Sequence, residues 1–316
     1  MSAPEFSVII PHRNDFDGLE RTLVALDTLF ATPSFEVIIA DNGSMGGVAA
    51  VSMLAARHPS LDLRVIDAPE PGAGPARNAG AALARAPMLA FLDCDCLPDA
   101  DWLQNAQQPL KQANAVLGGP VIASICNRPM RGINPAELFD VLYGFNVARS
   151  FHLDGLLLTA NLLMPRATFQ RVGPYLTGLS EDRDWCQRAR DLGFTLTLAP
   201  DLAVHHLALD DADRLRARWA RIARETHAYH HAHGSGRSSG LRYALVVALS
   251  PLVHGWRLLG PKAAGAPMAV RLRCLLLLLS VRAQRAWIGA RLALCDKATA
   301  FKDALWGWLT AKPSNR

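Results

Sequence analysis

Short apolar runs alternate with helical stretches along the first third of the chain. Nearly continuous apolar runs at residues 6–11, 35–40, 61–67 and 87–92 indicate buried strands, and residues 17–30 form a helical stretch between the first two. This alternation predicts βαβ units and a parallel sheet. The carboxyl ends of parallel strands meet at one edge of a sheet, where ligands usually bind.

The pattern becomes irregular after residue 115. The predicted elements are a strand over 115–125, a helix over 135–149, a strand over 155–165 interrupted by Thr159-Ala160-Asn161, a charged helix over 181–192, and strands over 195–199 and 203–206. Residues 227–240 are low in complexity and predict a hinge. We therefore expect two parts, an α/β domain over residues 1–235 and a helical region over residues 236–316.

The helical region is apolar and basic. Its apolar stretches, residues 243–256 and 274–281, are interrupted by Pro251 and His254 or flanked by arginines. Each is too short for a membrane span, which needs about 20 apolar residues. We expect helices that lie in a membrane interface. An ordinary helical hairpin packed on the main domain is the alternative.

Composition and charge sharpen this division. The chain has 316 residues, 50% of them hydrophobic, which excludes wholesale disorder. Residues 1–213 carry 15 Lys and Arg against 25 Asp and Glu, whereas residues 214–316 carry 18 against 3. The asymmetry predicts an acidic body and a basic tail that meets an anionic surface. Residues 1–5 contain no Lys or Arg, so we expect no secretory signal, and six cysteines without zinc spacing favour reduced thiols in the cytosol.

The end of the fourth apolar run carries two carboxylates in Leu92-Asp93-Cys94-Asp95-Cys96. Strand alternation points Asp93 and Asp95 to one side, where their charges would repel in a dry site. Mg²⁺ or Mn²⁺ held by one or two carboxylates and phosphate oxygens would offset that repulsion. The simpler interpretation is a solvated Asp-rich turn.

Two further loops add candidate binding groups. Asp41 ends the second strand in Asp-Asn-Gly-Ser, where a carboxylate can accept from a base N–H or a ribose hydroxyl. Residues 72–80 form a glycine-rich loop that opens onto a helix. Arg77 lies in the first turn of that helix, from where it can reach a diphosphate. Each loop could also be only a tight turn.

Five motifs together resemble one family. SVIIPHRND (7–15), DNGS (41–44), GPARNAG (74–80), LDCDC (92–96) and LSEDRDWCQRARDLGF (179–194) are similar, in order and spacing, to those of the family 2 glycosyltransferases. The resemblance covers about residues 6–206. It implies the α/β GT-A fold of nucleotide-diphospho-sugar transferases, with a mostly parallel mixed sheet flanked by helices.

The resemblance also implies roles for individual residues. Those expected to bind the donor and metal are Pro11 and Arg13 in the nucleotide pocket, Asp41 at the base, Arg77 at the base or diphosphate, Asp93 at the ribose, and Asp95 at the metal. Asp182 would be the catalytic base, with Glu181 beside it placing the acceptor. His206, six residues after Pro200, would contact the metal or diphosphate, although His205 and His206 could instead be a surface pair.

The implied activity is metal-dependent transfer of one sugar from a nucleotide-diphosphate donor to a hydroxyl acceptor, with inversion of the configuration at the anomeric carbon. The acceptor would be a polysaccharide, glycolipid or similar molecule. Mn²⁺ or Mg²⁺ is the expected cofactor. The QxxRW sequence of processive relatives is missing after Asp182, which favours single transfer. We expect a cytoplasmic protein, peripheral on the inner face of the cell membrane.

Two other functions stay open. A nucleotidyltransferase would share an acidic metal site, but it needs a basic Gly-rich loop after the first strand, and residues 11–17 have no glycine. A non-catalytic membrane or metal-binding protein could use the histidines at 227, 230, 231 and 233, although no Cys or carboxylate completes that set. Residues 214–224 are rich in arginine, but the apolar segments after them favour lipid, and we expect no nucleic-acid partner.

Overall fold

The computed structural model describes residues 3–29, 33–112, 114–125, 128–178, 180–234 and 236–295. They form two compact units. The first comprises the described residues within 1–122, 146–177 and 181–206, and the second comprises those within 123–145 and 178–180 and from 207 to 295.

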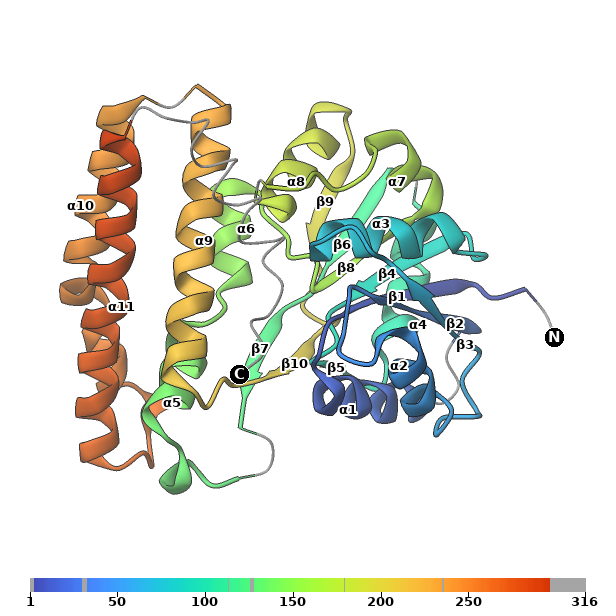
Figure 1. The fold of residues 1–316 in the computed structure, drawn as a ribbon, viewed down its shortest axis with the longest axis horizontal. Helices are drawn as coiled ribbons and strands as arrows, with labels where there is room; N and C mark the ends of the chain where they lie inside the picture. The colour runs from blue at the N-terminus through green and yellow to red at the C-terminus, as the bar shows by residue number, and fades with distance from the viewer. Residues whose placement is uncertain are drawn as a thin grey trace. The chain divides into compact units, whose positions relative to one another are not determined.

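The first unit is built on a mixed sheet with helices around it (Figure 1). In sheet order its strands are β3 (Leu63–Asp67), β2 (Phe35–Asp41), β1 (Phe6–His12), β4 (Met88–Leu92), β8 (Asn161–Pro165), β6 (Ala115–Gly118) and β9 (Thr195–Leu198). The strands from β3 to β4 are parallel, whereas β8 runs antiparallel to both of its neighbours. The parallel strands therefore end at a common edge.

A small second sheet and several helices complete this part of the chain. The small sheet has the order β5 (Cys96–Pro98), β10 (Val204–Leu207) and β7 (Val121–Ser124). The helices are α1 (Phe16–Asp27), α2 (Gly47–Ala55), α3 (Ala73–Leu83), α4 (Trp102–Gln107), α6 (Val147–Asp154), α7 (Arg166–Val172) and α8 (Glu181–Asp191).

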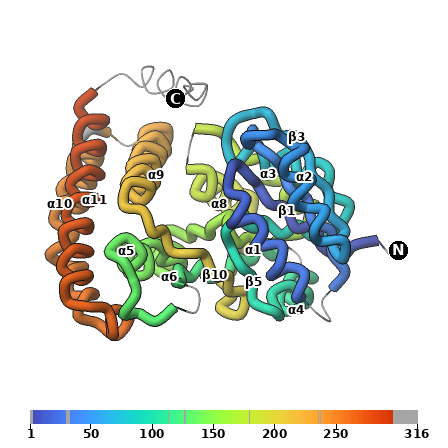
Figure 2. Tube along the Cα trace, turned by 60° about the horizontal axis from the view of Figure 1, so that its bottom comes forward, coloured from blue at the N-terminus to red at the C-terminus, as the bar shows by residue number. Residues whose placement is uncertain are grey.

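The second unit is helical. Its α-helices among the described residues are the short α5 (Pro135–Tyr143) and the longer α9 (Ala212–Ala232), α10 (Arg237–His254) and α11 (Met268–Leu294). Short 3-10 helices cover Pro109–Lys111 in the first unit and Met130–Gly132, Gly255–Leu259 and Pro261–Ala263 in the second. Helices α10 and α11 run side by side in both views (Figures 1 and 2). Among the described residues, no helix combines the length and the apolar composition that a bilayer span requires.

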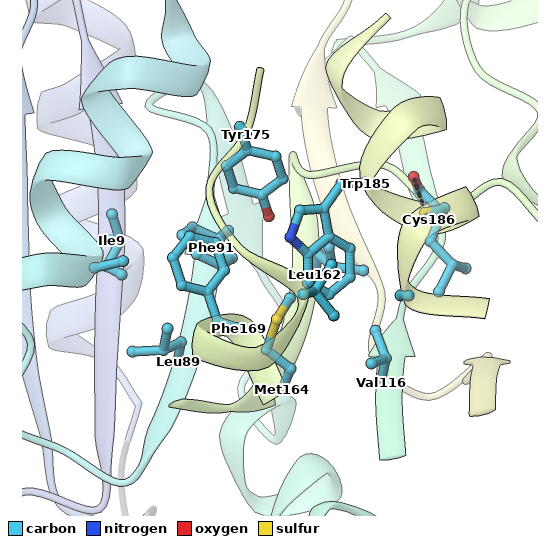
Figure 3. Close-up of a cluster of buried hydrophobic side chains, with 14 of the residues drawn as sticks. Ile9, Leu89, Phe91, Val116, Leu162, Met164, Phe169, Tyr175, Trp185 and Cys186 are labelled. Atoms are coloured by element: carbon cyan, nitrogen blue, oxygen red, sulfur yellow. Dashed lines mark hydrogen bonds between the residues drawn. The ribbon is translucent and has the colours of Figure 1, made fainter. Parts of the chain in front are cut away.

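A cluster of aromatic rings fixes α8 against the large sheet (Figure 3). Phe91 of β4 contacts Phe169 and Tyr175 with ring centroids 5.5 and 5.4 Å apart. Trp185 of α8 is fully buried, stacks on Phe169, and donates from its indole to the Gly173 carbonyl at 3.1 Å. Because aromatic side chains bury large apolar areas, this packing sets where the first turn of α8 lies.

The structure confirms the predicted α/β alternation of the first 100 residues and departs from it later. Residues 135–149 form two helices separated at Gly144, and a strand forms only from Asn161 because the preceding turn is bonded to α8. The expected hinge is largely helical, since α9 continues to Ala232. The predicted boundary after residue 235 falls inside the second unit. Residues 296–316 of the predicted helical region lie outside the described residues.

Candidate active site

The ends of β1 and β2 bring together a buried histidine and a buried carboxylate. The strand register pairs His12 with Asp41, and both side chains are about 1% exposed. His12 Nδ1 lies 3.4 Å from Asp41 Oδ1 and 3.2 Å from the Ser44 hydroxyl. The Ser44 N–H also points to the Asp41 carboxylate, at 3.3 and 3.4 Å from its oxygens. Asp41 is thus held rigidly at the edge of the sheet.

Asn42 ties the next strand and the glycine-rich loop to this edge. Its side-chain amide donates to the carbonyls of Ala68 and Glu70, each at 2.6 Å, and its carbonyl accepts from the Gly72 N–H at 2.8 Å. Gly72 has φ +125°, a conformation that L side chains rarely adopt. The start of α3 is therefore fixed beside the end of β2.

Arg77 of α3 connects two carboxylates that are far apart in sequence. Its guanidinium is 3% exposed, donates to Asp93 Oδ1 at 2.5 Å, and donates to Glu181 Oε1. Burial alone would lower the pKa of Arg77, but the carboxylates around it, Asp93 first, raise it well above its ordinary value. A Cβ on Gly74 would lie 2.6 Å from Glu181 Oε2, so glycine leaves room for that carboxylate.

The loop after β4 presents Asp93 and Asp95 differently. The Thr22 hydroxyl of α1 donates to the carbonyls of Cys94 at 2.9 Å and Cys96 at 3.2 Å, which fixes the loop. Asp93 faces Arg77, whereas Asp95 Oδ2 lies 3.0 Å from His206 Nε2.

The register of β10 decides which of the two neighbouring histidines reaches this loop. His206 pairs with Cys96 across the small sheet and is 8% exposed on its side chain. His205 points instead toward Asp99, at 3.1 Å, and is 40% exposed. The structure therefore brings His206, and not His205, to Asp95.

Asp95 and His206 fit two positions of a divalent-cation site. A carboxylate oxygen and an imidazole nitrogen 3.0 Å apart, both partly or largely buried, are suitable donors for Mn²⁺. Among the described residues, no group of three or more His, Cys, Asp and Glu side chains forms a metal site. Phosphate oxygens and water would have to complete the coordination, as is usual for Mg²⁺ at nucleotide sites.

Asp182 lies in the first turn of α8 and is held by Thr159. Its Oδ1 accepts from the Thr159 N–H at 3.1 Å and from the Thr159 hydroxyl at 2.5 Å. Burial, and then the charge of Glu181, raise the pKa of Asp182 to about 6, against the opposing effects of Arg77 and Thr159. A carboxylate with this pKa is suited to accept a proton near neutral pH.

Most of the predicted site residues lie on this edge of the first unit. Pro11 is buried in β1, and the Arg13 side chain after it is exposed. The sequence motifs alone did not indicate His12, Asn42 or Thr159 as site residues. Strand alternation and the turn after Asp41 could have indicated the first two, but the role of Thr159 depends on a contact 23 residues away.

Comparisons with known proteins agree on one class. The family model described as "Glycosyl transferase family 2" matches residues 7–163. A glycosyltransferase of Haloferax volcanii, AglE, is 29% identical over 210 residues, which cover 65% of this chain and 67% of that protein. The validoxylamine A glucosyltransferase of Streptomyces hygroscopicus subsp. limoneus is 30% identical over 223 residues, 61% of this chain and 48% of the relative.

Other relatives are matched over a smaller share of their length. The pre-mycofactocin glycosyltransferase of Mycobacterium tuberculosis is 30% identical over 140 residues, 44% of this chain and 27% of that protein. The chain thus spans about half of the Streptomyces relative and about a quarter of the mycobacterial one.

Two solved structures share the fold. A mannosyltransferase of Pyrobaculum calidifontis, solved with GDP-Man and Mn²⁺, has a TM-score of 0.56 at 19% identity and covers 99% of this chain and 82% of its own. TarS of S. aureus has a TM-score of 0.50 at 18% identity, with 92% of this chain and 54% of that chain covered.

Proposed function

Because the chain belongs to glycosyl transferase family 2 and has the GT-A fold, we propose that it transfers a single sugar from a nucleotide-diphosphate donor to a hydroxyl acceptor. The observation that carries this proposal is the Arg77 bridge. It joins Asp93, a candidate donor residue, to Glu181, a candidate acceptor residue 104 positions from Arg77. Donor and acceptor groups therefore share one site.

The donor would bind along the edge formed by β1, β2 and β4. Asp41 is positioned by Ser44 to accept from the base, and Asp93 from the ribose. Pro11 and Arg13 would line the nucleotide pocket. Arg77 would contact the base or diphosphate, and in this structure it also orients Asp93 and Glu181.

Asp95 and His206 would hold Mn²⁺ or Mg²⁺. When bound, the ion would offset the negative charge that develops on the departing diphosphate. The short contact between the two side chains supports this assignment.

Asp182 would act as the general base, with Glu181 helping to place the acceptor. Its carboxylate would take the proton from the acceptor hydroxyl as that oxygen bonds to the anomeric carbon and the bond to the diphosphate oxygen breaks. Attack opposite the leaving group inverts the configuration. The raised pKa of Asp182 and its two bonds from Thr159 support this role.

The acceptor would be a polysaccharide, glycolipid or similar molecule, used at the inner face of the cell membrane by a peripheral, cytoplasmic protein. The basic composition of the second unit supports that location. Two relatives are named for different acceptors, pre-mycofactocin and validoxylamine A, so the test compares a panel of donors.

A nucleotidyltransferase is the less supported alternative. His12-Arg13-Asn14-Asp15 follows the apolar part of β1, and no glycine-rich loop follows it. The Asp95–His206 pair would serve either reaction, but family membership favours sugar transfer.

The test is turnover across a panel of UDP-, GDP- and dTDP-sugars, with and without Mn²⁺. We expect one donor to be turned over, chelation with EDTA to stop turnover, Mn²⁺ to restore it, and the product anomer to be inverted by NMR. Asp95→Ala should lose metal-dependent turnover, and the exposed Asp191→Asn variant is the control. Wild-type turnover by Asp95→Ala would show that the metal site is assigned wrongly.

A further inference from the structure

Exposed apolar side chains concentrate on α10 and α11. Of the 22 large apolar side chains exposed in the described residues, 14 lie between Leu241 and Leu294. The most exposed is Leu252, at 84%. A soluble monomer rarely exposes a contiguous apolar patch of this kind unless the patch meets a partner or a membrane.

On each helix these side chains recur at helical spacing. On α10 and the 3-10 helix after it they are Leu245, Leu249, Leu252 and Trp256; on α11 they are Leu272, Leu276, Leu279 and Trp287. The opposite sides of the helices bury Ala244, Val247, Cys274, Leu278 and Val281. Helices α10 and α11 lie side by side in both views (Figures 1 and 2), and the exposed apolar side chains of the two helices are together called here the outer face.

The charge of this segment indicates the kind of partner. Residues 237–294 contain nine Arg and Lys and no Asp or Glu. Among those whose side chains the structure describes, four are exposed: Arg242, Lys262, Arg273 and Arg291. Arg291 lies over the exposed Trp287 ring, 5.2 Å from its centroid. Aromatic and cationic side chains at the border of an apolar face suit a lipid headgroup region.

A second copy of the chain fits less well. A two-fold contact through the outer face would bring together two basic surfaces, each with Arg242 and Arg273 and neither with an acidic residue. Like charges brought into a drier contact repel. Anionic lipid supplies the missing negative charge and an apolar layer together.

We propose that the outer face of α10 and α11 docks on anionic lipid bilayers, with the helices lying in the interface. Neither helix is suited to span a bilayer, which agrees with a peripheral contact. The use of this docking rests on the proposed function, because it would favour acceptors that present their hydroxyl at a membrane surface. The docking itself does not depend on catalysis.

Flotation of the full chain with vesicles tests this proposal. Vesicles of phosphatidylcholine alone are compared with vesicles containing about a third phosphatidylglycerol, a charge density sufficient for electrostatic binding. We expect binding to the anionic vesicles only, with a blue shift of tryptophan emission as Trp256 and Trp287, 65% and 60% exposed, enter the interface.

Paired variants separate the outer face from general effects. Leu252→Glu with Leu276→Glu should weaken binding at least about tenfold, since each loses apolar transfer and adds a negative charge. Arg242→Gln with Arg273→Gln should weaken it about fivefold for each cation. Met53→Glu, at a 71% exposed residue of α2, is the matched control and should bind as the wild type does.

Three outcomes would overturn the proposal. They are no flotation of the wild type on anionic vesicles, equal flotation of the Leu252/Leu276 variant, and a lipid-independent dimer that this variant converts to monomer. Thermal unfolding checks that each variant folds, and if the glutamate variant does not, the arginine variant decides. Vesicle binding without turnover of any donor would refute the proposed function and leave the docking intact.

Discussion

Charged side chains are arranged in opposite ways at the sheet edge of the first unit and on helices α10 and α11 of the second unit. At the edge, the buried Arg77 is bonded to Asp93 and Glu181. In α11, the mostly buried Arg285 lies over the Trp219 ring, 4.5 Å from its centroid, and donates to the Tyr243 hydroxyl at 2.9 Å. A bridge between opposite charges fixes the positions of reactive groups. A pair of helices without acidic residues instead has uncompensated positive charge, which attracts anions from outside the protein.

The pKa values follow the same contrast. The carboxylates raise the pKa of Arg77, while burial, and then the neighbouring Arg285, lower the pKa of Arg282 to about 10. Variants that remove charges from the first region should therefore affect chemistry and folding, and variants on the outer face should affect surface binding.

The largest effect is expected from Asp182→Asn. The amide keeps the shape and can still accept from Thr159, but it cannot take a proton, so kcat should fall about 10²- to 10⁴-fold. Steady-state kinetics with the donor identified in the panel measure this. Asp191→Asn, at the exposed end of the same helix, should retain the wild-type kcat.

Substitution of Arg77, the cation that bridges Asp93 and Glu181, should lower the free energy of unfolding. Arg77→Met leaves Asp93 and Glu181, which are 34% and 26% exposed, without a countercharge, and the free energy of unfolding should fall by about 1–3 kcal/mol. Urea unfolding measures the change. The control is Arg183→Met on α8, whose ion pair with Asp154 is partly exposed and should contribute less than about 1 kcal/mol. An equal effect of the two substitutions would contradict the assigned importance of the bridge.

Alanine substitution of two leucines of α11 compares how much a buried and an exposed side chain of this helix contribute to stability. Leu278 is fully buried, so Leu278→Ala should lower the free energy of unfolding by about 2–5 kcal/mol. Leu276, two residues away, is 60% exposed, and Leu276→Ala should change it by less than about 0.5 kcal/mol. Denaturant unfolding distinguishes them, and a large loss at Leu276 would mean that the outer face is covered within the protein.

The acid limb of the rate profile should report Asp182. Because burial and Glu181 raise its pKa to about 6, kcat/KM should fall as pH decreases through that value and the base becomes protonated. The same raised pKa means that protonation favours the folded state, so the contribution of this group to stability increases as pH falls from about 6 toward 4.

Thr159→Val tests the cause of that pKa. Loss of the hydroxyl donor, one of the contacts that lower the pKa, should move the acid limb up by about one pH unit. Thr159→Ser keeps the donor and should leave the limb in place. An unchanged limb in the valine variant would mean that Asp182 is not the titrating group.

The pattern of apolar and polar residues predicted the first four strands of the large sheet, because that pattern is set by neighbouring residues alone. The strands predicted over residues 6–11, 35–40, 61–67 and 87–92 agree with β1, β2, β3 and β4 within two residues, because each is a short apolar run followed by polar residues. The helical hinge was missed because its histidines and alanines are compatible with a helix that tertiary packing extends.

Long-range contacts could not be predicted in the same way. The choice of His206 over His205 depends on the register between β10 and β5, which neither strand encodes alone. The Arg77 bridge spans 16 and 104 residues, so spacing predicted the importance of Arg77 without its partners. The sequence predicted apolar and basic helices in this region but not which of their leucines are exposed, since the exposure of each leucine depends on the packing of α10 against α11.

We propose that one edge of the first unit binds the donor through Asp95 and activates the acceptor through Asp182. Titration calorimetry of the donor's nucleoside diphosphate with Mn²⁺, run beside turnover on the same protein samples, separates these two roles. Asp182→Asn should bind as the wild type does and lose turnover, whereas Asp95→Ala should lose the Mn²⁺-dependent part of binding. Wild-type turnover by Asp182→Asn, or unchanged Mn²⁺-dependent binding by Asp95→Ala, would contradict the claim.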